Sequence, residues 1–375
     1  MSTAGSDVVV VGGGPAGAAT ALRLAGAGAT VTLVHDGRER WRPGGQELSG
    51  AALPLLRELG VADEVTASAL PVHEARSAWS GPGVDHRSAI FNPYGPPRSL
   101  DRGVLDALLR HAARRAGVRS VRAHARLPAS EALRTSAGPM VVDATGAARA
   151  VGARRLPWTT VDRLCCALWR VPARAQPFSL VEAAPEGWWY TAPLPGRTHL
   201  TVMRVGDLPA RTPGVPGETP PPPPQTRRRL TAPLPSAPDA YRVAVIGVAE
   251  RPWAPGLVAV GDAAVSVDPL SSSGLLNALR LAVPAADAVL GLLDGDEAPA
   301  RHYTRLVHAL FEEHLARRLH YLTLPAAHRH HAFWAARTGQ LHESVIEDER
   351  GLPATAPFGR PGRVSSAERA AGPRA

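Results

Sequence analysis

The feature that most constrains the fold of this chain is a glycine-rich loop that directly follows a run of β-branched residues. Residues 8–11 are four valines, residues 12–17 read GGGPAG, and an Ala/Leu-rich stretch follows over residues 18–25. A second apolar run, residues 30–34, arrives at the distance that completes a strand–helix–strand unit. A G-x-G-x-x-G loop between a buried strand and a helix is the fingerprint of a dinucleotide-binding unit. The sequence therefore predicts an α/β fold built on a parallel sheet.

Each part of this loop has a physical role. Gly12 permits the tight turn, Gly14 lets the backbone approach a pyrophosphate, and Gly17 lets the helix pack closely on the strand. Pro15 and Ala16 open the helix, whose free N–H groups and positive dipole end attract phosphate.

The end of the second predicted strand departs from this pattern. An acidic side chain is expected there to accept hydrogen bonds from a ribose, but His35 occupies the position and Asp36 follows it. Either Asp36 substitutes after a small register shift, or His35 holds the ribose more weakly. A strand-end histidine that faces solvent is an equally simple interpretation.

Length and composition narrow the class of protein. With 375 residues the chain is long enough for two interlocked lobes. It contains no run of eighteen apolar residues and no signal-peptide n-region, so we expect a cytoplasmic protein without a membrane partner. Cys165 and Cys166 are adjacent in an apolar run, where neighbouring strand residues point to opposite faces. We interpret them as core residues rather than a redox pair.

The positive charge of the chain, leaving histidine aside, comes from arginine side chains. The formal net charge is +9, and no lysine is present. This bias, with the abundance of Ala, Gly and Pro, is typical of a GC-rich bacterial genome. The arginines are scattered and do not alternate with aromatic residues as in stretches that stack bases, so we expect no nucleic-acid partner.

A second motif lies near the C-terminal third of the chain. Residues 256–260 form an apolar run that ends in Gly261 and Asp262, and residues 268–274 then lead into a leucine-rich helix. A carboxylate at a strand end can accept hydrogen bonds from a polyol such as a ribityl chain. A helix that starts on Ser and Gly points its first amides at a group in front of it, and its dipole would stabilise an anion on a flavin ring.

The two motifs together resemble those of the FAD-dependent hydroxylase and halogenase superfamily, which shares the para-hydroxybenzoate-hydroxylase-like fold. GGGPAG at 12–17 pairs with VGDAAVSVDPLSSSG at 260–274, and DATG at 143–146 agrees. The segments GGQELSGAALPLLRELG, AIFNPYG, SLDRGVLDALL and GWWYTAPLP resemble the branch that contains tryptophan-halogenase-like and LodB-like flavoproteins. Members of the LodB-like group hydroxylate tryptophan in a protein precursor. The resemblance extends to about Trp334.

The resemblance implies an FAD site with contributions from both motifs. Gln46 stands where the family usually has glutamate, so together with His35 a second acidic residue is missing beside the cofactor. We therefore expect FAD to be held loosely or supplied in reduced form. The implied cofactor-binding residues are Gly12, Gly14, Pro15, Ala16, Gly17, His35, Asp36, Gln46, Arg102, Gly146, Gly261, Asp262, Pro269, Ser272, Gly274 and Leu275.

The expected organisation is a discontinuous Rossmann-like FAD-binding domain of the glutathione-reductase type, interleaved with an antiparallel β-sheet substrate domain. The FAD-binding domain would comprise residues 1–75, 99–157 and 252–297. The substrate domain would comprise residues 76–98 and 158–251, with a proline-rich loop at 213–229 that is exposed and extended. A C-terminal helical region would follow over 298–350, and a disordered tail over 351–375.

The catalytic residues cannot be assigned from the sequence. Halogenases of this group use an active-site lysine, which this chain lacks, so halogenation is disfavoured. His86 is a candidate base or a surface histidine, and the histidines of residues 328–331 indicate a solvated loop rather than a metal site. Aromatic pocket candidates, each of which could equally be a core residue, are Trp79, Phe91, Tyr94, Trp189 and Tyr190, with Asn92 beside them.

These observations predict an FAD-dependent monooxygenase that hydroxylates an indole- or phenol-like substrate, either free or bound to a peptide or carrier protein. O2 would be the co-substrate, because the flavin itself carries the difficult oxygen chemistry. No second G-x-G-x-x-G is present for NAD(P)H, so electrons would come from transiently bound NAD(P)H or from a partner flavin reductase. The alternatives are a flavin-dependent oxidase or dehydrogenase, and a degenerate flavoprotein that acts as a binding or maturation partner.

Overall fold

The strand–glycine-loop–helix unit predicted at the N-terminus is present. The computed structural model describes residues 6–37, 46–123, 140–173, 176–207 and 220–339, and Met1–Thr338 form one compact unit. In that unit β1 (Val8–Val11) leads into α1 (Pro15–Gly26) and then into β2 (Val31–His35). The two strands pair in parallel, with Val8 opposite Val31. The predicted α/β fold is confirmed.

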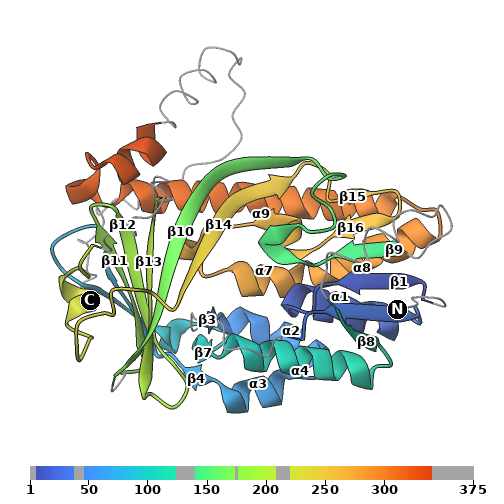
Figure 1. The fold of residues 1–375 in the computed structure, drawn as a ribbon, viewed down its shortest axis with the longest axis horizontal. Helices are drawn as coiled ribbons and strands as arrows, with labels where there is room; N and C mark the ends of the chain where they lie inside the picture. Colours follow the sequence, from blue (N-terminus) through green and yellow to red (C-terminus); the bar gives the residue numbers. More distant parts are fainter. Residues whose placement is uncertain (1–5, 38–45, 124–139, 174–175, 208–219, 340–375) are drawn as a thin grey trace, which may run out of the picture. The chain divides into compact units, whose positions relative to one another are not determined.

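This unit is the centre of a six-stranded sheet of order β15-β16-β9-β1-β2-β8, drawn at the right of Figure 1. All neighbours pair in parallel except β15 and β16. Helices α1, α4 (Arg102–Arg115) and α8 (Ala282–Leu293) pack together beside it. Buried apolar strands covered by helices are typical of parallel sheets. The remaining strands are β8 (Arg119–Arg122), β9 (Met140–Asp143), β15 (Trp253–Ala254) and β16 (Leu257–Ala259).

The second lobe is an eight-stranded, mainly antiparallel sheet of order β17-β14-β10-β13-β12-β11-β5-β6 (Figure 1). Because side chains alternate along a strand, the sheet has two apolar faces. Its inner face, with Trp188 and Tyr190, joins the large core that includes the parallel-sheet lobe. Its outer face, with Trp169 and Trp189, forms a separate core. The strands are β5 (Glu74–Ala78), β6 (Asp85–Ser88), β10 (Trp158–Pro172), β11 (Phe178–Ala184), β12 (Gly187–Pro193), β13 (His199–Asp207), β14 (Ala240–Ala249) and β17 (Val265–Ser266).

A small three-stranded sheet, β3-β7-β4, adjoins the larger sheet. The Ser99 hydroxyl of β7 donates to the Pro193 carbonyl of β12 at 2.5 Å, which ties the two sheets together. The segments around these strands are β3 (Gln46–Leu48), η1 (Gly50–Ala52), α2 (Leu53–Glu58), α3 (Ala62–Ser68), β4 (Leu70–Pro71), η2 (Ala89–Phe91) and β7 (Arg98–Leu100).

The C-terminal helical region predicted over residues 298–350 begins with the long helix α9 (Ala298–Thr323), which runs past both large sheets in Figure 1. The stretch Gly274–Leu293 is the one segment of the described residues long and apolar enough to cross a membrane, with mean hydropathy 1.5. Half of it is buried, because α8 packs against α1 and α9 as a core helix. The other short elements are η3 (Gly146–Ala148), η4 (Gly261–Ala263), η5 (Pro269–Ser271), α7 (Gly274–Arg280) and η6 (Ala326–His328).

The C-terminal half of the proline-rich segment differs from its prediction. Residues 213–219 lie outside the described residues, but Pro224–Arg227 form a helical turn, α6, and Thr226 is fully buried. The buried Glu182 carboxylate accepts hydrogen bonds from the N–H groups of Gln225 and Thr226, at 2.9 and 2.6 Å. An exposed extended loop was therefore the wrong prediction here, because a carboxylate on the outer face caps this turn and fixes it on the sheet. The predicted tail, residues 351–375, and residues 340–350 before it also lie outside the described residues.

Candidate functional site

The glycine loop is shaped by two close backbone approaches. Gly12 has φ +116°, and a Cβ there would lie 2.1 Å from the Ala144 carbonyl oxygen. A Cβ on Gly17 would lie 2.0 Å from the Gly12 carbonyl oxygen. Gly14 is different, since its Cβ would meet only Arg102 Nη2, at 3.4 Å. Gly12 and Gly17 are thus required by packing, whereas Gly14 leaves open space in front of the loop.

The N-terminus of α1 faces that space without a side-chain partner of its own. Gly14 is the N-cap residue and provides no capping side chain, Pro15 follows, and no acidic residue lies in the first turn. The first N–H groups and the positive end of the helix dipole therefore remain available to an anion. This is the arrangement in which a pyrophosphate binds to a Rossmann-type unit.

The second motif meets the first at this point. Gly261, which has φ +62°, lies so near α1 that a Cβ on it would come 2.7 Å from the Ala16 Cβ. Asp262 is solvent-accessible, yet surrounding protein raises the pKa of its carboxyl by desolvation, with the charge of Arg102 acting in the opposite direction. The loop of residues 12–17 and Asp262 therefore border one region, as the two motifs predict.

Helix α4 supports this region from behind. Asp101 caps the helix by accepting a hydrogen bond from Gly103 N, and Arg102 forms an ion pair with Asp106 at 2.6 Å. Arg110, two turns further on, donates to the Gly13 carbonyl oxygen at 3.2 Å. Arg102 is thereby positioned between Gly14 and Asp262.

The DATG turn packs against the same loop. The buried Asp143 carboxylate at the end of β9 accepts hydrogen bonds from the N–H and hydroxyl of Thr145 and from the N–H of Gly152. This fixes the turn in which Ala144 contacts Gly12 and Gly146 has φ +68°. The residues present fit a dinucleotide pyrophosphate: two glycines that exclude side chains, an uncapped helix N-terminus, and flanking Arg102 and Asp262.

His35 is already engaged within the protein. Its Nδ1 accepts a hydrogen bond from Gly37 N at 3.1 Å, and its Nε2 lies 2.9 Å from the Ser120 hydroxyl. Burial lowers the pKa of His35, and the charges of Arg110 and Arg122 lower it further, while Asp36 opposes them. A neutral imidazole with both nitrogens occupied has no acceptor left for a ribose, so of the two predicted residues the exposed Asp36 is the better placed.

The loop of residues 268–274 is held in place by α9. The Arg318 guanidinium donates to Asp268 Oδ2 at 2.7 Å, and His314 Nε2 accepts from the Asp268 N–H at 3.0 Å. Asp268 Oδ1 in turn accepts from Leu270 N. Burial lowers the pKa of His314 to about 4, and Arg318 adds to this while Asp268 opposes it. His314 is therefore neutral at pH 7, as its acceptor role requires.

Four of the predicted cofactor-binding residues lie on this anchored loop and at the start of the helix after it. Pro269 begins η5, Ser272 has the left-handed φ of +48°, and Gly274 and Leu275 open α7. Ser273, the N-cap of α7, forms no capping hydrogen bond with its side chain. The left-handed Ser272 turns the chain so that α7 begins in the same part of the molecule as η4, which it contacts.

Most of the predicted aromatic pocket residues lie elsewhere. Trp189 is buried on the outer face, stacked on Trp169 with ring centroids 5.9 Å apart, which corrects its assignment to a substrate pocket. Phe91 and Tyr94 are exposed, at 88% and 54%. Trp79 is a core residue that packs edge-on against Trp334 and donates to the Tyr321 carbonyl oxygen.

The two polar candidates, Asn92 and His86, are also accounted for. The Asn92 side chain accepts a hydrogen bond from Tyr94 N within its own turn. His86 lies on β6 opposite Arg76 and pairs with Glu74 at 2.5 Å, away from the glycine loop. Among the residues that the structure describes, no group of three potential metal ligands occurs.

Tyr190 is the one aromatic candidate on the inner face that carries a polar partner. Its hydroxyl points to Glu47 Oε2, 3.5 Å away, and the Glu47 carboxyl also interacts with Ser179. Burial raises the pKa of Glu47, against the lowering effect of these hydrogen bonds, and burial raises that of Tyr190 as well. Sequence reasoning missed Glu47, because strand alternation alone does not reveal which of Gln46 and Glu47 faces the larger sheet.

Comparisons with known proteins agree with this geometry. Residues 5–155 match a family model described as an FAD-binding domain. A digeranylgeranylglycerophospholipid reductase of Methanopyrus kandleri is 26% identical over 318 residues, which cover 80% of this chain and 84% of the relative.

Solved structures with the same fold include two enzymes. QhpG, a peptidyl tryptophan dihydroxylase of tryptophylquinone biogenesis, matches with a TM-score of 0.69 and 23% identity, covering 88% of this chain and 78% of QhpG. The myxobacterial chondrochloren halogenase CndH, an FAD-dependent enzyme, matches with a TM-score of 0.73 and 20% identity, covering 92% and 90%.

Proposed function

We propose that this chain, an FAD-dependent oxidoreductase with the fold of the FAD-dependent hydroxylases and halogenases, is a monooxygenase that hydroxylates an aromatic substrate of the indole or phenol class. The resemblance drawn from its motifs is confirmed by the family match and the shared fold. The observation that carries the finer proposal is the pairing of Tyr190 with Glu47 on the inner face of the sheet. Support also comes from QhpG, which acts on peptidyl tryptophan.

The position of Glu47 supports a role beside the flavin ring. Strand β3, which carries Glu47, is followed within two residues by η1, and η1 contacts α7. The start of α7 is the segment that the family resemblance assigns to the flavin ring. Glu47 thus lies between the inner face of the large sheet and the expected ring position.

The chemistry is divided between cofactor and protein. When bound, reduced FAD supplies the activation of O2 and the transfer of oxygen. Glu47, with its raised pKa, would hold the proton of a phenol hydroxyl or indole N–H, and Tyr190 would orient that carboxyl. The buried apolar residues of the inner face would exclude water from the reacting ring.

Halogenation is a weaker candidate for this chain. The family route relies on a lysine amine, and the sequence contains no lysine. Without lysine, the chain has no side-chain amine that could serve this step. The shared fold with CndH therefore supports the flavin site but not the halogenating step.

A non-oxygenating flavoenzyme is the second candidate, and the phospholipid reductase relative is the observation that favours it. A reductase adds electrons to its substrate and incorporates no oxygen atom from O2. The two candidates differ in the fate of O2, which makes them directly separable.

The experiment is an assay with FAD, an NAD(P)H-driven flavin reductase and isotopically labelled O2, using tryptophan-, tyrosine- and indole-containing substrates. We expect a product that carries one labelled oxygen atom, detected by mass spectrometry. Anaerobic turnover without label would instead favour a reductase. If the purified chain neither binds FAD nor turns over, the enzyme proposal fails and a flavin-free maturation partner replaces it.

Glu47→Gln tests the assigned residue within this assay. It keeps the hydrogen-bonding shape but cannot accept the substrate proton, so the rate of hydroxylation should fall about 100-fold with FAD binding unchanged. Glu182→Gln, the same substitution on the outer face of the sheet, is the matched control. We further propose that electrons come from NAD(P)H through a partner reductase, that the substrate is carried by a peptide or carrier protein, and that the enzyme works in the cytoplasm.

A further inference from the structure

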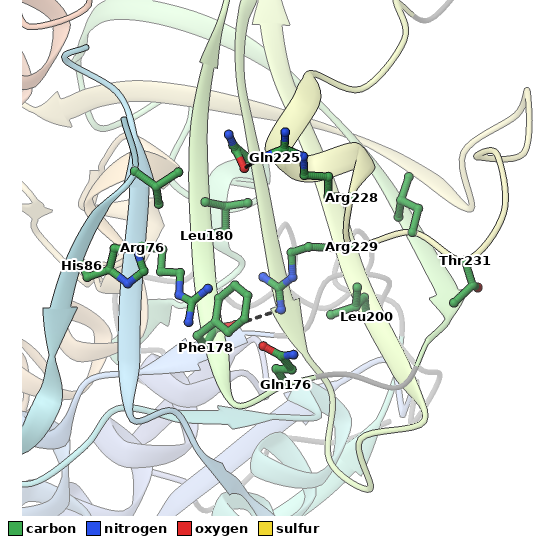
Figure 2. A pocket seen from close by; sticks show the side chains of 12 residues that line it. Arg76, His86, Gln176, Phe178, Leu180, Leu200, Gln225, Arg228, Arg229 and Thr231 are labelled. Atoms are coloured by element: carbon green, nitrogen blue, oxygen red, sulfur yellow. Dashed lines mark hydrogen bonds between the residues drawn. The ribbon is translucent and has the colours of Figure 1, made fainter. Parts of the chain in front are cut away.

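A cavity of about 430 Å³ lies on the outer face of the eight-stranded sheet. It is bounded by β5, β6 and β11 on one side and by α6 and the residues after it on the other (Figure 2). No residue of the glycine loop or of η4 lines it. It is therefore separate from the proposed flavin site, which faces the opposite side of the same sheet.

Two guanidinium groups flank one aromatic ring in this cavity. The Arg76 Cζ lies 3.7 Å from the centroid of the Phe178 ring, and the Arg229 Cζ lies 3.9 Å from it. Figure 2 shows both side chains converging on Phe178. Two cations placed this near each other repel, so their convergence needs a compensating negative charge.

Arg229 finds only neutral partners. Its guanidinium donates to the carbonyl and hydroxyl oxygens of Thr191, at 3.1 and 2.8 Å, and to the Phe178 carbonyl oxygen at 3.0 Å. Within the described ranges, no carboxylate forms an ion pair with it. Burial lowers the pKa of Arg229 to about 10, and the charge of Arg76 contributes to this, while Tyr190 opposes it. A largely enclosed cation without a carboxylate is costly for the protein alone.

Arg76 is only partly neutralised. One terminal nitrogen, Nη2, donates to Glu74 Oε2 at 2.7 Å, while its Nε is buried without any hydrogen-bond partner. Glu74 Oε1 also lies 2.5 Å from His86 Nδ1, so one carboxylate pairs with two basic side chains. With Arg228 also at the rim, the cavity holds more positive than negative charge.

Part of the wall is apolar, while Gln176, Gln225 and Thr231 add uncharged polar groups. Leu180, Leu200 and Leu230 line the cavity together with the Phe178 ring. Unsatisfied guanidinium donors next to an aliphatic and aromatic wall match a ligand with an anionic head and an apolar body.

We propose that this outer-face cavity binds an organic oxyanion, a carboxylate or phosphate monoester on an apolar body, through Arg76 and Arg229. The anionic head accepts hydrogen bonds from the guanidinium groups of Arg76 and Arg229, which both line the cavity. Its apolar body packs on Phe178 and the three leucines. This ligand is a second one, bound independently of the flavin and its substrate.

Isothermal titration calorimetry on the full chain, saturated with FAD, tests the proposal. Benzoate and phenyl phosphate distinguish the two kinds of head group, and inorganic phosphate tests whether the apolar body is needed. We expect saturable binding of at least one aryl anion, and about tenfold or more weaker binding in Arg76→Gln. Glu74→Gln should tighten binding, because it removes the carboxylate that competes for Arg76.

Arg227→Gln is the matched control. Arg227 is exposed on α6, next to Arg228, but does not line the cavity. It should bind as wild type does, which excludes a general effect of net charge. Since Arg229 also bonds to Thr191 and Phe178, Arg229→Gln is interpreted only with an unchanged melting temperature.

Three outcomes would overturn the proposal. The first is the absence of saturable binding for all three probes. The second is equal affinity in Arg76→Gln and Arg227→Gln. The third is binding that shifts the flavin absorption bands and ignores Arg76→Gln, because such a ligand occupies the flavin site. None of these depends on whether the chain hydroxylates an aromatic substrate.

Discussion

Acid should destabilise this protein through His314, the neutral imidazole that accepts a hydrogen bond from the Asp268 N–H. Its pKa falls from 6.5 to about 4 on folding, chiefly because the ring is buried, at 5% exposure. Between these values the unfolded chain binds a proton that the folded protein does not, so stability falls as the pH decreases.

The size of the effect follows from the shift. One pKa unit corresponds to about 1.4 kcal/mol, so the whole shift is worth about 3 kcal/mol. At pH 5 the unfolded imidazole is protonated and the folded one mostly neutral, so about 2 kcal/mol of this is lost relative to pH 7.5. Below pH 4 both states are protonated and the loss levels off.

His314→Gln isolates this contribution. Glutamine can accept the Asp268 N–H with its amide oxygen but does not titrate. Urea unfolding, followed by tryptophan fluorescence between pH 7.5 and 4.5, should give similar free energies of unfolding for both proteins at pH 7.5. At pH 5 the variant should have lost about 2 kcal/mol less than the wild type. Parallel pH profiles for the two proteins would refute the assignment, since all other titrating groups are shared.

Four further substitutions test the fold and the site. Gly17→Ala should destabilise the protein by about 3 kcal/mol or more in thermal unfolding, because its Cβ would lie 2.0 Å from a carbonyl oxygen. Gly14→Ala should leave stability within about 1 kcal/mol but weaken the binding of FAD in a fluorescence titration. Equal effects of the two substitutions would contradict their separate roles. Glu182→Gln should cost about 1–2 kcal/mol in urea unfolding by weakening the cap of α6, and no loss would show that α6 is held otherwise. Arg318→Met leaves the Asp268 carboxylate buried without its partner, so about 3–5 kcal/mol should be lost, whereas a stability equal to wild type would mean that the ion pair contributes nothing.

The fold was predictable where local patterns carry the information. The valine run, the GGGPAG loop and the Gly261–Asp262 motif have fixed spacings that physics restricts to a strand, a turn and a helix start. Their meeting at Ala16 and Gly261 follows from the family resemblance, and the structure shows the contact. The C-terminal helical region was predicted to start at residue 298, where α9 begins.

The sites away from the glycine loop depend on non-local pairing. Trp188, Trp189 and Tyr190 are consecutive, and a period of two says that they alternate but not which of them faces the flavin domain. Glu47 meets Tyr190 only because β3 joins a separate small sheet. The outer-face cavity unites Arg76 and Arg229, which are far apart in sequence and show no motif.

One carboxylate on β10 connects the C-terminal region to the loop of residues 268–274. Asp162 Oδ2 forms an ion pair with Arg337 Nε at 2.7 Å and a second one with Arg318, which also pairs with Asp268. The hydrogen bonds and charges of the two arginines lower the pKa of Asp162 against the effect of burial. Shortening the chain to end before Arg337 would therefore remove one of two counter-charges from a strand, and Arg318 would be drawn more strongly to Asp162 at the expense of Asp268. Arg337 thus helps to hold the loop of residues 268–274 through Asp162 and Arg318, and shortened versions of the chain made for crystallisation should retain it.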